Sequence, residues 1–253
     1  RNPESPSEAA ARKLAWQMEP GRSVEIEVET KHDLKFAKPI PGAGGFDATE
    51  EHSIESAGKR FCDSRSYHEG KLTSRTSYYW DGSKGGNLTF RAGDDDRFET
   101  QQTFTITPHY YTEIKGERME RPQPLLFLYV GREPLHKALG KAAYLGDSTV
   151  LNRDCDRFLF RNVQWMTPQD HVYHLDRETA IPLKVEAFRD EEAQLKNEPL
   201  WIWEALSLDQ VEDLRLPLHS EDRILAGNSA GSRREIAVKS IRFRHEDPAS
   251  TFW

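Results

Sequence analysis

Long apolar runs and a basic charge excess are both missing from this sequence. The most apolar stretch, Leu125 to Val130, is far shorter than the roughly 18 to 20 apolar residues of a transmembrane helix. Lysine and arginine number 35 against 42 aspartates and glutamates, which gives a net charge of -7. The short apolar run predicts no transmembrane segment. Because nucleic-acid binding needs a basic surface, the net charge predicts no nucleic-acid partner.

Cysteine is also scarce, and its pattern excludes the common zinc sites. Cys62 and Cys155 are the two cysteines, without a Cys-x-x-Cys pair or a Cys/His zinc spacing. Two separate buried thiols are the simplest interpretation. A disulfide between them is the alternative, and it would fit an oxidising compartment. We expect no metal site and no cofactor.

Most of the sequence has the pattern of β-strands. From Ser23 to Thr30, Val24, Ile26 and Val28 alternate with three glutamates, which predicts valine and isoleucine in the core and glutamates in water. Between Cys155 and Asp190, three consecutive segments favour antiparallel strands joined by short turns. We expect no catalytic group inside this three-stranded meander.

Helices are predicted at two places. Ser5 or Ser7 can cap a first helix that runs to about Met18. A second helical region is expected from Leu125 to Leu145, divided near Gly131 and Pro134, with a turn at Gly146 and Asp147. Long crossover helices are few, so a parallel sheet is not expected.

The predicted fold class is α+β. About eleven strands form one strongly curved antiparallel sheet, an incomplete β-barrel, with helices covering the concave face. Residues 1–253 are expected to form a single domain. Within it, residues 38–45 form a loop insertion and residues 245–253 a loose tail.

Candidate catalytic residues are few in the sequence. Gly227-Asn228-Ser229-Ala230-Gly231 approximates the serine elbow Gly-x-Ser-x-Gly, but its flanks are polar and favour a loop. His171 and His174 are three apart in a predicted strand, so they face opposite sides and do not chelate one ion. The sequence therefore indicates a protein that is not an enzyme.

The layout resembles the LolA-type carriers of outer-membrane lipoproteins and their periplasmic relatives. Asp176, Thr179, Pro182 and Leu183 are similar to the family phrase Asp-x-x-Thr-Gly-Leu-Pro-Leu, and Ala180 stands where glycine is usual. Leu216-Pro217 is similar to a later family strand. The resemblance implies a half-barrel wrapped around helices, with an apolar concave face that holds acyl chains. The basic residue beside the cavity of the Lol carriers has no single arginine to match it here.

The resemblance implies an exported, periplasmic protein, and a chain that begins at Arg1 is consistent with a removed signal peptide. We expect non-enzymatic binding of a lipid or lipoprotein acyl chain, by a carrier or sensor, with a membrane-bound protein as a further candidate partner. The alternatives are a structural or interaction domain whose cavity is filled by its own side chains, and a hydrolase acting in the concavity. Large apolar residues of the predicted strands are the expected cavity lining: Trp80, Phe104, Phe158, Phe160, Trp201 and Trp203.

Overall fold

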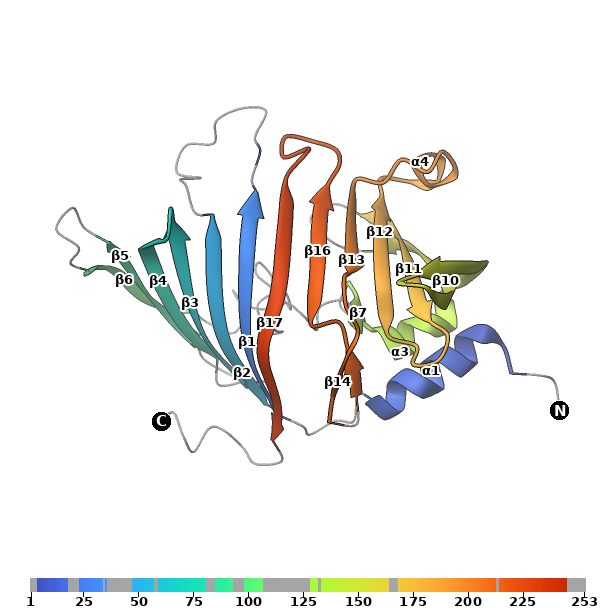
Figure 1. Ribbon diagram of the computed structural model, residues 1–253, viewed down its shortest axis with the longest axis horizontal. Helices are drawn as coiled ribbons and strands as arrows, with labels where there is room; N and C mark the ends of the chain where they lie inside the picture. The colour runs from blue at the N-terminus through green and yellow to red at the C-terminus, as the bar shows by residue number, and fades with distance from the viewer. Residues whose placement is uncertain are drawn as a thin grey trace. The chain divides into compact units, whose positions relative to one another are not determined.

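A computed structural model describes most of the chain (Figure 1). The described residues are 4–17, 23–33, 35, 47–56, 59–80, 85–92, 98–106, 128–131, 133–163, 168–212 and 214–244. The predicted loop insertion at 38–45 and the predicted loose tail at 245–253 lie outside these residues.

The chain divides into two compact units. The first comprises Arg1–Glu19, Leu34–Pro39 and Phe127–Glu235, and the second comprises Pro20–Asp33, Ile40–Leu126 and Ile236–Trp253. The last strand, β17 (Arg233–Arg244), begins in the first unit and continues in the second. Each unit is built on antiparallel strands, so the predicted antiparallel architecture is confirmed.

The first unit contains the sheet order β16-β13-β12-β11-β10-β9, with β11 paired on both sides. Its main strands are β9 (Ala143–Val150), β10 (Arg153–Val163), β11 (Gln169–Asp176), β12 (Pro182–Phe188), β13 (Trp201–Ala205) and β16 (His219–Ile224). Its smaller elements are α1 (Pro6–Gln17), β7 (Tyr129–Val130), β8 (Glu133–Pro134), α3 (Leu135–Ala138), the short 3-10 turn η4 (Leu139–Lys141), α4 (Glu191–Leu195), β14 (Asp209–Val211) and β15 (Leu214–Leu216).

The second unit is a meander with the order β6-β5-β4-β3-β2-β1. Its strands are β1 (Ser23–Asp33), β2 (Ala48–Ser56), β3 (Lys59–His68), β4 (Lys71–Trp80), β5 (Gly85–Ala92) and β6 (Phe98–Ile106). A tight turn joins β3 and β4, with positive φ at Glu69 and Gly70 as a tight hairpin requires. In the described chain β6 and β9 each pair on one side, so the antiparallel sheet is not closed.

The alternation in β1 sets the core of the second unit. Ile26 and Val28 are buried and pack with Ile236 of β17, as the period-2 pattern predicts. The side chain of Val24 lies outside the described part of the structure, so its burial stays a prediction.

The glutamates of β1 differ in their exposure. Glu27 is exposed, as expected. Glu25 and Glu29 are partly exposed, so they lie less in water than the alternation predicts without being buried. Glu25 lies beside His52 and Glu29 beside Lys239, and these cross-strand partners cover them.

Helix α1 begins with a capping box. The Glu8 backbone N–H donates to Ser5 Oγ at 3.3 Å, and the Ser5 N–H donates to Glu8 Oε2 at 2.8 Å. These reciprocal bonds satisfy two backbone donors at the helix start, which selects Ser5 rather than Ser7 as the cap. On the other face, Leu14 is fully buried. Helix α1 packs against α3 and η4 in the first unit (Figure 1).

The predicted helical region from Leu125 to Leu145 is mostly not helical. Residues 125–127 and 132 lie outside the described part. Among the described residues of this region, helix comprises Leu128 and Leu135–Lys141, where Leu135 and Leu139 are fully buried. Ala143–Val150 is the edge strand β9, so the predicted turn at Gly146 and Asp147 is also wrong. Pairing of β9 with β10 decides the matter, because tertiary hydrogen bonding overrides weak helical spacing. Whether helices cover a concave face stays a prediction.

The meander from Cys155 to Asp190 is confirmed as β10, β11 and β12. Strand β11 is buried at seven of its eight positions, because it lies in the middle of the first unit's sheet.

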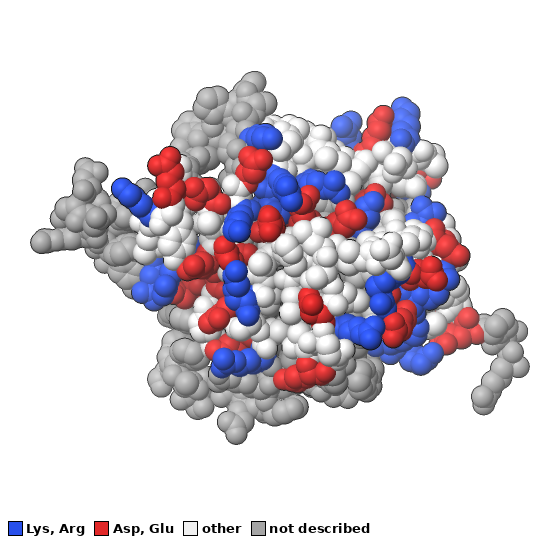
Figure 2. All heavy atoms as spheres, viewed as in Figure 1, with Lys and Arg blue, Asp and Glu red and all other residues white. Residues whose placement is uncertain are grey.

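Within the described residues, no helix is long and apolar enough to cross a membrane. Figure 2 shows acidic and basic side chains interspersed over the face in view.

Candidate functional site

The register of four strands places most of the large aromatic residues of β10 to β13 on one face, while Phe188 of β12 lies on the other. Directly paired residues point to the same side of a sheet. One row pairs Phe158 with Tyr173, Tyr173 with Val185, and Val185 with Trp203. The next row on the same side is Phe160, His171, Ala187 and Trp201. We call this surface the aromatic face, and it comprises Phe158, Phe160, His171, Tyr173, Trp201 and Trp203.

Ring contacts connect these residues across the strands. The ring centroids of Phe160 and Tyr173 lie 5.2 Å apart, edge to face. The His171 ring stacks on Tyr173 at 6.4 Å and meets Trp201 edge-on at 5.6 Å. Such separations are those of favourable aromatic pairs. Phe158, Phe160 and Trp203 are buried, while Trp201 is half-buried.

Strand β7 lies over the aromatic face at Tyr173. The Tyr173 hydroxyl donates a 2.7 Å hydrogen bond to the Tyr129 carbonyl oxygen of β7. Burial raises the pKa of Tyr173, because the phenolate would have to form away from water. The phenol therefore stays a donor, and this bond identifies the side of the sheet on which β7 lies.

His171 is the unusual member of the aromatic face. It is 3% exposed, and burial lowers its pKa to about 4 despite the neighbouring Asp170. Its Nε2 lies 3.4 Å from Gln169 Oε1, a long hydrogen bond. Its Nδ1 is buried and has no hydrogen-bond partner. A neutral imidazole with one unsatisfied nitrogen thus sits among apolar rings.

An ion pair lies at the end of the first aromatic row. Trp203 pairs in register with Asp222 of β16, and Asp222 is buried against Arg234 at the start of β17. Burial raises the pKa of Asp222, although Arg234 opposes the shift. The aromatic face therefore has a charged boundary in the first unit.

Two of the predicted lining residues belong to the other unit. Trp80 ends β4, where it pairs with Arg60 and Gly85. Phe104 lies in β6 and pairs with Asn87 of β5. Their side chains lie outside the described part of the structure. The register therefore brings together four of the six predicted residues, and the role of Trp80 and Phe104 stays a prediction.

A second polar cluster occupies the opposite face of the same sheet. His174 is buried, with Nδ1 2.9 Å from Ser148 Oγ and Nε2 2.9 Å from Glu186 Oε2. Lys184 Nζ lies 2.8 Å from the other oxygen of Glu186. Burial would raise the pKa of Glu186, but the hydrogen bonds from His174 and Lys184 lower it to about 2. His171 and His174 face opposite sides, as predicted.

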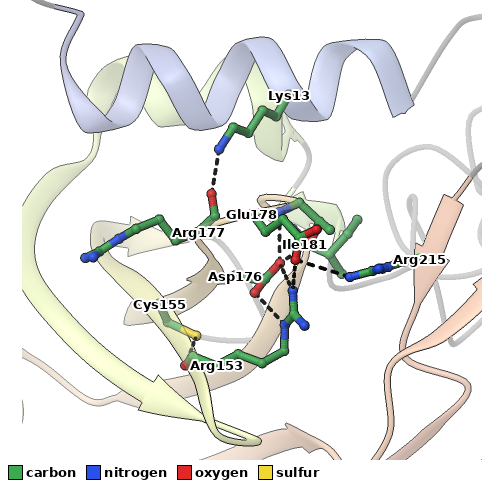
Figure 3. Close-up of polar contacts among 9 residues, drawn as sticks. Lys13, Arg153, Cys155, Asp176, Arg177, Glu178, Ile181 and Arg215 are labelled. Atoms are coloured by element: carbon green, nitrogen blue, oxygen red, sulfur yellow. Dashed lines mark hydrogen bonds and ion pairs between the residues drawn. The ribbon is translucent and has the colours of Figure 1, made fainter.

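The family-like phrase forms the turn between β11 and β12 (Figure 3). Asp176 is 1% exposed and accepts hydrogen bonds from the Thr179 backbone N–H at 2.8 Å and the Thr179 hydroxyl at 2.6 Å. Arg153 donates to both Asp176 oxygens, at 2.7 and 3.1 Å. Burial opposes the charge of Asp176, but these bonds outweigh it and lower its pKa. The phrase is therefore structural, since its polar members satisfy one another.

Helix α1 is attached to this turn. Lys13 Nζ donates a 2.5 Å hydrogen bond to the Arg177 carbonyl oxygen, as Figure 3 shows. Glu178 Oε2 accepts hydrogen bonds from the Arg153 guanidinium at 2.6 Å and from the Arg215 guanidinium at 3.2 Å. The second bond connects β15 to the same turn. The cluster links α1, β10 and β15 to one short connection.

The cysteines and the serine-elbow segment have structural places in the fold. Cys62 and Cys155 are both buried thiols rather than the halves of a disulfide. The segment from Gly227 to Gly231 is a hairpin turn between β16 and β17, with positive φ at both glycines, and not a strand-to-helix elbow. No group of three or more metal-ligating side chains converges among the described residues.

Sequence reasoning missed Tyr173 and His171 as members of the aromatic face. The period-2 pattern of a strand gave a signal, because it places His171 and Tyr173 on one face and Val172 on the other. The sequence predicted the pairing of the three strands but not the register, which aligns these residues with Phe158, Phe160 and Trp201. Register is set by tertiary pairing.

Comparison with known proteins gives a likeness in fold. No family model and no curated protein sequence matches the chain. A solved LolA superfamily protein from Nitrosomonas europaea aligns over 99% of this chain and 98% of its own, with a TM-score of 0.53 and 9% identity. A DUF1329 family protein from Desulfovibrio piger aligns over 96% and 94%, with a TM-score of 0.51 and 8% identity.

Proposed function

We propose that this chain, whose fold is that of the LolA superfamily, binds the acyl chain of a lipid or lipoprotein without enzymatic chemistry. The aromatic face would form the wall of an apolar cavity. One observation carries the proposal: Phe158, Phe160, Trp201 and Trp203 come from two separate strands, and the register brings them to one side. Burying a methylene stabilises by about 0.8 kcal/mol, so a long acyl chain gains several kcal/mol on such a wall.

The setting proposed for this activity is the cell envelope. A carrier or sensor of acyl chains would work in the periplasm or another exported location, with a membrane-bound protein as a further partner. The likeness to a LolA superfamily protein supports this setting only through the fold.

Neighbouring residues of β13 provide a matched test. Trp201 lies on the aromatic face and Ile202 on the opposite face, and both are half-buried. We expect Trp201→Gln to weaken binding of a fluorescent fatty-acid analogue about ten-fold, because a lost aromatic contact of about 1.5 kcal/mol corresponds to that ratio. Ile202→Gln should leave the affinity unchanged. Binding is measured by fluorescence titration, and folding by circular dichroism.

Two results would contradict the proposal. Folded wild-type protein that binds no fatty-acid analogue would leave a structural or interaction domain, in which β7 and neighbouring side chains fill the space over the aromatic face. The Tyr173 to Tyr129 hydrogen bond is the observation that favours this alternative. Equal losses in Trp201→Gln and Ile202→Gln would place binding elsewhere than on the aromatic face.

A second candidate function is ester hydrolysis, and the Ser148, His174 and Glu186 cluster favours it. Serine, imidazole and carboxylate lie in hydrogen-bond sequence, with both bonds at 2.9 Å. In such a reaction Ser148 Oγ would attack an ester carbonyl while His174 accepts its proton and passes it to the leaving alcohol; water would then release the acid. This cluster lies opposite the aromatic face, so it is a different site from the predicted concavity.

The hydrolase candidate has a direct assay. Turnover of p-nitrophenyl butyrate by the wild type should be lost in Ser148→Ala and kept in Ser207→Ala, whose serine bonds Asp209 outside the cluster. Absence of turnover in folded wild-type protein would remove this candidate. The cluster is then a structural network that satisfies a buried histidine.

A further inference from the structure

His171 is a polar group that the first unit buries without completing its hydrogen bonds. Its side chain lies on the aromatic face, with Tyr173 stacked on one side and Trp201 meeting it edge-on. Nδ1 has no hydrogen-bond partner, while Nε2 lies 3.4 Å from Gln169 Oε1. Buried donors and acceptors in proteins are almost always paired, and leaving one unpaired destabilises the fold. A position of this kind points to a partner supplied by a bound molecule.

The partner of Nε2 decides which kind of group suits Nδ1. A carboxamide oxygen accepts and does not donate, so Nε2 carries the ring proton where it faces Gln169 Oε1. In the neutral imidazole, Nδ1 then has a lone pair and accepts. The pKa of about 4 keeps the ring neutral near pH 7, so this lone pair is available. The group that fits is a hydrogen-bond donor.

We infer that His171 Nδ1 accepts a hydrogen bond from a donor group, a hydroxyl in its simplest form, on an acyl-chain ligand that lies along the aromatic face. This inference rests on the proposed function and names the chemistry of the ligand's polar end. The acyl chain of the ligand contacts the aromatic rings, and the hydrogen bond to His171 fixes the position of the ligand's polar group along the aromatic face. His171 is a specificity-determining residue for amphiphiles that carry a donor, over apolar molecules of equal length.

A pair of probes that differ in one donor tests the inference. 1-Dodecanol and dodecyl methyl ether share the same chain and an oxygen acceptor, but only the alcohol donates. We expect the wild type to bind the alcohol about five-fold more tightly, as one buried hydrogen bond predicts. The extra methyl group of the ether works against this preference, which makes the comparison conservative. Affinities are measured by displacement of a fluorescent fatty-acid analogue.

The matched variant is His171→Phe, which keeps an aromatic ring beside Tyr173 and Trp201 and removes both nitrogens. The ratio of alcohol to ether affinity should fall about five-fold from its wild-type value, as expected when a single buried hydrogen bond is lost, while the ether still binds. A ratio that is unchanged in His171→Phe, or a wild type that binds both probes equally, overturns the role of His171 and leaves the proposed function standing. A wild type that binds neither probe removes the proposed function as well.

A measurement on the wild type alone covers the case in which His171→Phe does not fold. The imidazole nitrogen signals of His171, followed by NMR with labelled histidine, report whether Nδ1 carries a proton. Addition of 1-dodecanol should shift the unprotonated Nδ1 signal as it accepts a hydrogen bond, and dodecyl methyl ether should not. A protonated Nδ1, or no shift at saturating alcohol, contradicts the inference.

Discussion

Ala180 shows what a single backbone angle demands in this fold. It occupies the position where the resembling family has glycine, and its φ is 62°, in the left-handed region. Its N–H bonds the Asp176 carbonyl oxygen at 2.6 Å, so the turn that Asp176 and Thr179 form requires this angle. A Cβ in that conformation costs about 1–2 kcal/mol, which glycine avoids.

The first prediction at this scale compares two buried alanines. Ala180→Gly should be neutral or stabilise by up to about 1 kcal/mol, because relief of the left-handed strain offsets the lost methyl group. Ala187→Gly, at an extended and fully buried position of β12, should destabilise by about 1 kcal/mol or more. Urea unfolding of both variants measures the difference. An Ala180→Gly loss as large as that of Ala187→Gly would contradict the strain argument.

At the scale of elements, helix α1 is held by contacts far from it in sequence. It is a short helix whose isolated stability is marginal, so tertiary contacts maintain it. Leu14 supplies the buried contact, and Lys13 bonds the Arg177 carbonyl oxygen in the β11–β12 turn. The attachment to this turn is therefore a specific one.

The element-scale prediction removes that bond. Lys13→Met keeps most of the side-chain length but loses the ammonium donor, so the helix should open more readily. We expect amide hydrogen exchange in α1 to speed up several-fold, with a change in global stability of about 1 kcal/mol or less. Arg12→Met is the control, because Arg12 contacts only the exposed Glu4 among the described residues. Equal exchange in the two variants would contradict the role of Lys13.

At the scale of the whole molecule, strand pairing places a charged group, Glu186, in a largely buried cluster with His174 and Lys184. Glu186 has a pKa of about 2 in the folded protein against an ordinary value of 4.5. Its contribution to stability is therefore complete above pH 4.5 and is lost as pH falls from 4.5 towards 2. The contribution is on the order of 3 kcal/mol, from about 1.4 kcal/mol per unit of pKa.

The corresponding prediction concerns acid unfolding. Glu186→Gln should lower stability at pH 7 and flatten the loss of stability between pH 4.5 and 2, because no carboxylate remains to protonate. Glu191→Gln, at an exposed position of α4, should leave the wild-type pH dependence in place. Urea midpoints recorded at several pH values give both curves. A Glu186→Gln curve as steep as the wild type's would contradict the assignment.

The local elements were largely determined by the sequence alone. Alternation in β1, aromatic and β-branched residues in β10 to β13, and the serine-glutamate pair at α1 specify local geometry, and the structure has these elements. The family resemblance, drawn from the layout and the Asp176 to Leu183 phrase, agrees with the fold of the two solved structures. These features are local because they depend on side-chain period and on hydrogen bonds within a few residues.

Only the tertiary structure decided which side chains meet. Ala143–Val150 is a strand because its backbone pairs with β10. The position of Glu25 beside His52 depends on the pairing of β1 with a neighbouring strand. The aromatic face and the unpaired nitrogen of His171 arise from register across four strands. A shift of one residue would turn every side chain to the other face, and no single segment of sequence contains that choice.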